Sequence, residues 1–207
     1  MTKGERTRQL IVERAMPLFN TRGYFGASLS DIIRETGLEK GGIYNHFDSK
    51  EAIALAAFDH AVGLVAGLFG DALAGKERAT DRLAAIVGVY ANLADGSLLP
   101  GGCPILNTAV EADDTQPLLR DRARAAMADC LRLIGATVKE GIGRGELRPE
   151  TDPRAVATVI AATLEGAIVL TRLYDDWEHM RRATEHLHGY IAALAVSSHE
   201  DEGDRRW

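Results

Sequence analysis

The sequence is poor in residues that mark several classes of protein. Only two cysteines, Cys103 and Cys130, occur in 207 residues, and their spacing fits neither a disulfide framework nor a metal site. No uninterrupted apolar run approaches the ~20 residues that a membrane span needs. The N-terminal segment carries scattered charges and no apolar stretch, so we expect no signal peptide. These absences predict a cytoplasmic protein with no membrane association, no metal and no cofactor.

The composition favours helices. Proline is rare, runs of alternating β-branched residues are missing, and alanine, leucine, arginine and glutamate dominate, which is typical of an all-α protein. With 46% apolar residues, the chain can bury one substantial core and carry a small appended head. Apolar periodicity, caps and glycine breaks predict about nine helices, at residues 4–22, 28–37, 40–47, 49–73, 80–94, 104–111, 117–142, 152–174 and 178–195, followed by a disordered tail at 197–207.

The segment from residue 23 to residue 51 is the most informative part of the chain. Ser28 followed by Asp31 resembles a capping box at a helix start, and Gly37 is a helix end. The next helix, from Lys40 to His46, spans roughly 10 Å at ~1.5 Å per residue. So short a helix adds little to a core, but it fits the DNA major groove, which is about 12 Å wide. The segment therefore predicts a helix-turn-helix.

The distribution of charge agrees weakly with this prediction. Residues 1–50 contain eight basic and six acidic residues, a net charge of +2, whereas the rest of the chain carries −8 within a total of −6. Because attraction to phosphate is local and screened by salt, a weakly basic head on an acidic body can bind DNA.

The same residues carry a resemblance to a known family. The Ser28-x-x-Asp31-Ile32 start and the Gly37-x-x-Lys40-Gly41-x-x-Tyr44-x-His46-Phe47-x-x-Lys50-Glu51 run resemble the tetracycline-repressor (TetR) family of transcriptional regulators. The resemblance implies a DNA-binding domain at 1–50 and a ligand-binding and dimerisation domain at 51–196. It also implies a homodimeric repressor that leaves its palindromic operator when a small-molecule effector enters the body.

The candidate DNA-binding residues are Ser28, Lys40, Gly41, Gly42, Tyr44, Asn45, His46 and Lys50. Tyr44 and His46 can donate hydrogen bonds to phosphates, and the glycines let the backbone come close to DNA. Asn45 can contact an adenine edge at two points. Tyr44 could instead pack in the head, as Phe47 is expected to do. Glu39 and Gly42 depart from the family pattern, which weakens any inference about the bases that are read.

The resemblance places the effector among the helices that follow the fourth. The candidate pocket residues are Phe58, Val62, Phe69, Tyr90, Cys103, Asn107, Val110, Glu165 and Val169. At helical spacing such residues are more often ordinary core residues than part of a ligand-binding wall. Glu111, Asp113 and Glu165 are the acids that could favour a cationic ligand if they lay near an apolar pocket.

The last two expected helices have broad apolar faces interspersed with small residues, which predict a four-helix bundle between two subunits. The candidate interface residues are Val156, Val159, Ile160, Thr163, Ala167, Ile168, Tyr174, Leu187, Tyr190, Ile191 and Leu194. These faces could instead pack on their own body.

Two alternatives to an effector-controlled repressor stay open. Cys103 lies in a glycine-rich turn at a helix start, where free amides can lower the pKa of a thiol, so the chain could sense electrophiles or oxidants. No lysine lies nearby in the sequence to activate the thiol, so a buried, inert Cys103 is the favoured interpretation. A helical adaptor that does not bind DNA is the other alternative. An enzyme is not expected, because the sequence shows no paired carboxylates and no nucleophile beside a base.

Overall fold

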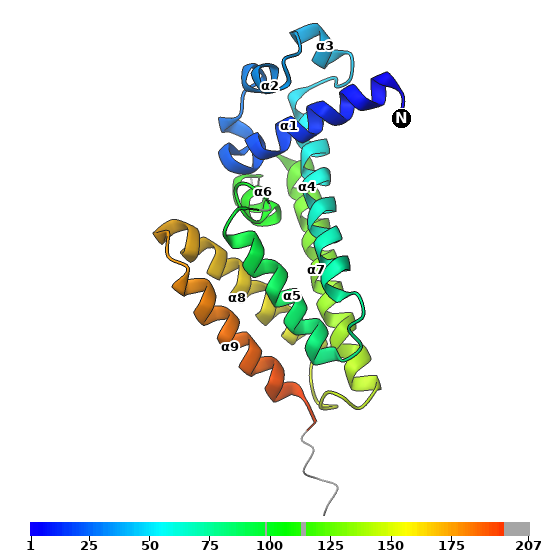
Figure 1. Cartoon of the computed structure of the whole chain (residues 1–207), viewed down its shortest axis with the longest axis vertical. Helices are drawn as coiled ribbons and strands as arrows, with labels where there is room; N and C mark the ends of the chain where they lie inside the picture. The colour runs from blue at the N-terminus through cyan, green and yellow to red at the C-terminus, as the bar shows by residue number, and fades with distance from the viewer. Residues whose placement is uncertain (98, 113–114, 197–207) are drawn as a thin grey trace, which may run out of the picture.

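The computed structural model describes residues 1–97, 99–112 and 115–196, and within them it is all-α (Figure 1). The predicted tail at 197–207 and Asp113 lie outside the described residues. The nine helices of the described chain are α1 (Lys3–Gly26), α2 (Leu29–Thr36), α3 (Lys40–Tyr44), α4 (Lys50–Leu73), α5 (Ala79–Ala94), α6 (Pro104–Ala112), α7 (Pro117–Gly143), α8 (Pro153–Tyr174) and α9 (Glu178–Leu194). The predicted all-α fold is confirmed.

Helices α1–α3 form a small head at one end of the molecule, packed on the first turns of α4 (Figure 1). Ile11, Ile32, Ile43 and Phe47 are buried together in this head. Helix α2 starts at the predicted capping box, in which Asp31 N–H donates to Ser28 Oγ over 3.1 Å and Ser28 N–H donates to Asp31 Oδ2 over 3.0 Å. It ends at Gly37, whose φ of 67° favours glycine.

Helix α4 belongs to the head and to the body. Ile53 and Ala57 pack in the core of the head, whereas Phe58, Val65 and Phe69 pack in the larger core that α5–α9 share. One continuous helix therefore connects the two cores. The domain boundary at residue 50 stays a prediction. The core of the head extends beyond it, to Ala57 of α4.

The first helix continues beyond its predicted end. Gly23 interrupts α1 with φ 73° and ψ 175°, and one further turn runs to Gly26. A Cβ at position 23 would lie 2.3 Å from Oε2 of Glu111 in α6. Glycine is thus required by the backbone conformation and by the close approach of a carboxylate.

Two helices, α4 and α8, are long and apolar enough to cross a membrane by length and composition alone. Half of the most apolar window of α8 and 39% of that of α4 are buried inside the structure. Both helices supply core residues such as Phe69 and Ile160, which is the ordinary cause of such a composition in a core helix.

Candidate nucleic-acid interface and ligand cavity

Helix α3 lies at the outer end of the head (Figure 1). Its anchor is apolar, because Ile43 is fully buried and Phe47 is 4% exposed. The Ile43 carbonyl accepts hydrogen bonds from the amides of His46 and Phe47, so a helical turn continues past Tyr44 to the second anchor. The Glu39 side chain makes no capping hydrogen bond to the described chain, which leaves the start of α3 uncapped by a side chain.

Four of the candidate DNA-binding residues share an exposed band on and just after α3. Lys40, Gly41, Tyr44 and Asn45 are exposed, and Tyr44 keeps 44% of its surface accessible. Lys40 Nζ lies 5.9 Å from the centre of the Tyr44 ring, which places a cation beside the phenol. The band thus combines a positive charge, an amide and a hydroxyl at one end of the molecule.

The other four candidates lie outside this band. Gly42 and His46 are half-buried. Ser28 Oγ donates to Asp31 Oδ2 over 2.6 Å, and hydrogen bonds from Ser28 and Arg34 hold the pKa of the Asp31 carboxyl well below its usual range. Lys50 Nζ lies 4.4 Å above the ring of Tyr24, so Lys50 faces the end of α1.

Comparisons with known proteins agree with this architecture. Residues 11–57 match the family described as bacterial regulatory proteins, tetR family, and residues 79–187 match the tetracyclin repressor-like C-terminal domain. The chain belongs to the TetR family. It is a helix-turn-helix transcriptional regulator and not an enzyme, as the sequence predicted.

Individual TetR-family proteins resemble the chain over nearly its whole length. A TetR regulator from Chloroflexus aurantiacus is 47% identical with a TM-score of 0.90, covering 94% of this chain and 98% of its own. A TetR-family regulator from Cytophaga hutchinsonii is 39% identical with a TM-score of 0.90, covering 95% and 98%. The transcriptional repressor DhaR of a Mycobacterium species is 28% identical over 83% of this chain and 85% of its own length.

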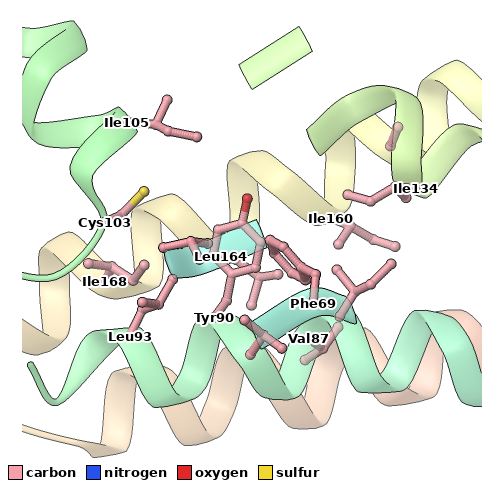
Figure 2. Close-up of a cluster of buried hydrophobic side chains, with 14 of the residues drawn as sticks. Phe69, Val87, Tyr90, Leu93, Cys103, Ile105, Ile134, Ile160, Leu164 and Ile168 are labelled. Atoms are coloured by element: carbon pink, nitrogen blue, oxygen red, sulfur yellow. The ribbon is translucent and has the colours of Figure 1, made fainter. Parts of the chain in front are cut away.

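The body of this TetR protein contains an apolar cavity of about 350 Å³ between α4, α5, α6 and α7. Phe69 and Tyr90 line it with ring centres 5.8 Å apart, and Figure 2 labels both residues in the same buried cluster as Leu93 and Cys103. Four of the predicted pocket residues line the cavity, namely Val62, Phe69, Tyr90 and Cys103. Its size and apolar lining suit a small organic molecule.

The remaining predicted pocket residues lie elsewhere. Phe58 and Asn107 line a smaller neighbouring crevice, together with Glu111. Val110 is 76% exposed on α6 and Val169 is 45% exposed on α8. Glu165 is buried behind Cys103, whose thiol donates to Glu165 Oε1 over 3.1 Å.

Cys103 is a poor candidate for a reactive thiolate in this structure. It is 3% exposed, and burial, together with the neighbouring Glu165, raises the pKa of its thiol well above the usual range. Burial also raises the pKa of the Cys130 thiol and that of the Glu165 carboxyl. The thiol of Cys103 is therefore held as a hydrogen-bond donor to a carboxylate.

A hydrogen-bonded contact between α1 and α6 was not predicted from the sequence. Glu111 accepts hydrogen bonds from the amides of Tyr24 and Phe25, at 2.7 Å and 3.0 Å, directly after the break at Gly23. Asn107 Nδ2 donates to the carbonyl of Asn20 over 3.0 Å. The glycine was visible in the sequence, but its acidic partner lies 88 positions away.

The predicted interface residues divide by exposure. Val159 and Tyr174 are exposed, at 41% and 64%, and Thr163 and Tyr190 are half-buried. The other seven are buried in the core of their own chain, namely Val156, Ile160, Ala167, Ile168, Leu187, Ile191 and Leu194.

We predict that Glu111→Ala frees the amides of Tyr24 and Phe25. Losing a charged acceptor from these two amides, of which that of Tyr24 is partly buried, costs about 1 kcal/mol of local stability, or roughly fivefold in hydrogen exchange at these positions. The measurement is residue-resolved amide exchange, with Glu140→Ala on α7, an exposed residue, as control. Unchanged protection of Tyr24 and Phe25 would contradict the assigned contact.

We also predict that Cys103 resists alkylation. At pH 7.5 iodoacetamide should modify it at least about tenfold more slowly than in the unfolded chain, because the thiolate is the nucleophile and burial suppresses it. Glu165→Gln removes the carboxylate that raises the thiol pKa, so the pKa should fall and the rate rise. Mass spectrometry of the Cys103 peptide gives both rates. Fast alkylation of the folded wild type would restore the thiol-sensing hypothesis.

Proposed function

We propose that this TetR-family regulator represses transcription in the cytoplasm by binding a palindromic operator as a homodimer, and that a small molecule in the cavity releases it. The observation that carries the DNA-binding part is the exposed band of Lys40, Gly41, Tyr44 and Asn45, held by two buried anchors. A surface of this size reads only a few base pairs, so specificity requires two heads about 34 Å apart.

The side chains of the band divide into two roles. Tyr44 and Lys40 bind phosphates and position the head, and His46 and Lys50 add contacts outside the band. Asn45 is exposed directly after α3, and its carboxamide has the donor and acceptor that match an adenine edge. Ser28 acts through its cap, because its hydroxyl and amide are bonded to Asp31, and this fixes the N-terminus of α2.

A second copy of the chain is the proposed occupant of the exposed apolar face of α8. Val159, Ala162, Gly166, Leu170 and Leu173 are exposed along this helix and recur at intervals of three or four residues, which defines one stripe. Small residues in its middle allow two helices to approach closely. On α9 the exposed face also contains small residues, namely Gly189, Ala192 and Ala193.

Helix α6 supplies a route from the cavity to the head. Cys103 lies at the cavity wall just before α6, Asn107 bonds to Asn20, and Glu111 bonds to the last turn of α1. These three residues are spaced by four, so they share one face of the helix. An effector that displaces the start of α6 therefore acts on two hydrogen-bonded contacts with the head, and this is the proposed path of release.

The test of operator binding is selection of bound duplexes from a random pool by the purified protein. We expect a palindrome to be enriched. Tyr44→Ala should lower the affinity for all sequences about tenfold, by loss of a phosphate contact. Asn45→Ala should change the base preferred at one position of each half-site, while Val110→Ala, at an exposed position on α6 outside the band, should change neither. No enrichment at any salt concentration would favour the adaptor hypothesis.

The test of the dimer is a charge placed in the stripe on α8. Leu173 is 71% exposed, so Leu173→Glu is tolerated by the free subunit but places an unpaired charge in the proposed interface. We expect the mass from light scattering to fall from that of two chains to that of one. Val110→Glu, a matched change at an exposed valine on α6, should leave two chains. A dimeric Leu173→Glu protein would contradict the proposed interface.

A further inference from the structure

The polar side chains of the cavity wall are weak acids. Tyr90, Cys103 and Cys130 line the cavity, and the carboxyl group of Glu165 lies directly behind the Cys103 thiol, 3.1 Å from its sulfur. Burial and the nearby charge of Glu165 both raise the pKa of Tyr90, of Cys103 and of Cys130. The phenol and the two thiols come from α5, from the turn before α6 and from α7, and the carboxyl group comes from α8.

The carboxyl group of Glu165 is only half satisfied. Glu165 is buried, with 8% of its surface exposed. Oε1 accepts the thiol of Cys103, whereas Oε2 is buried and has no hydrogen-bond partner in the described part of the chain. A buried carboxyl oxygen without a partner is costly, and natural structures pair nearly all such groups with protein, water or another bound species.

The rest of the wall adds no positive charge. Within the described residues the lining contains no lysine, arginine or histidine, and its other ionisable residue is Asp129. Asp129 is exposed and ion-paired with Arg132, so its charge is compensated outside. The uncompensated acid is therefore Glu165, which does not itself line the cavity but contacts the lining residue Cys103. Other parts of the wall are apolar, with residues such as Val65, Phe69 and Leu133.

We propose that the effector of this regulator is an apolar amine, whose ammonium group binds where Tyr90, Cys103 and Cys130 line the cavity and pairs with Glu165 behind the Cys103 thiol. The ammonium group supplies the donor that Oε2 lacks and the charge that a buried carboxylate needs. The hydrocarbon part of the amine fills the apolar remainder of the cavity. This inference rests on the proposed function, because it names the ligand of the cavity described there.

Binding of an amine beside Cys103 affects the hydrogen-bonded contact between α6 and the head. Cys103 precedes α6, and its carbonyl accepts the amide of Asn107, the residue that bonds to Asn20. Because Cys103 lines the cavity and Glu165 does not, an ammonium group that reaches the carboxylate displaces the thiol of Cys103 and moves the first turn of α6. Ligand charge and operator release are thereby coupled through one residue.

The test compares two probes that differ in charge. Binding of 4-phenylbutylamine and of 4-phenylbutan-1-ol to the full chain at pH 7.5 is measured by titration calorimetry. We expect the amine to bind the wild type at least about tenfold more tightly than the alcohol, as a charge-assisted hydrogen bond at a buried site requires. Glu165→Gln should bring the two affinities within about a factor of two. Glu140→Gln, at an exposed glutamate of α7, should keep the wild-type ratio.

The outcomes separate this inference from the function on which it rests. Equal binding of amine and alcohol by the wild type would overturn the amine proposal and leave a ligand cavity in place. Binding of neither probe would overturn both the amine proposal and the assignment of the cavity. A wild-type ratio retained in a folded Glu165→Gln protein would overturn the role of Glu165. If Glu165→Gln fails to fold, the wild-type ratio alone decides whether charge is recognised.

Discussion

The structure depends on a carboxylate that caps a broken helix. Glu111 accepts the amides of Tyr24 and Phe25, which are left without intrahelical partners because Gly23 interrupts α1. This cap is contributed from α6 and not from the neighbouring sequence, so it joins the head to the body. The apolar cores hold each part together, but these polar contacts fix the direction in which the last turn of α1 leaves the break.

The cavity shows how burial decides the chemistry of a residue type. In the sequence, Cys103 lies in a turn that can activate a thiol. In the fold, the same turn brings the thiol into an apolar region against Glu165, and both effects raise its pKa. The glycines of that turn serve packing, because Gly101, with φ 96°, approaches the carbonyl of Asn20 so closely that a Cβ would lie 2.3 Å from its oxygen.

The sequence predicted the features that local chemistry determines. The all-α fold, the capping box at Ser28 and the end of α2 at Gly37 follow from short-range patterns, and they are confirmed. The contact of Glu111 with α1 could not be predicted, because a single chain gives no signal of which distant acid caps a helix break. On α8, apolar residues occur on several faces, so periodicity could not separate Ile160, which is buried, from Val159, which is exposed.

The continuity of α4 has a mechanical consequence. This helix has 24 residues and is therefore about 36 Å long at ~1.5 Å per residue. One end is embedded beside the cavity through Phe69, and the other is embedded in the head through Ile53. If α4 moves as a rigid body, a tilt of about 5° at its cavity end displaces its end in the head by roughly 3 Å. Such a displacement is comparable to a hydrogen-bond length, so in the proposed dimer a slight rearrangement inside the body would take the two heads out of register with successive turns of DNA.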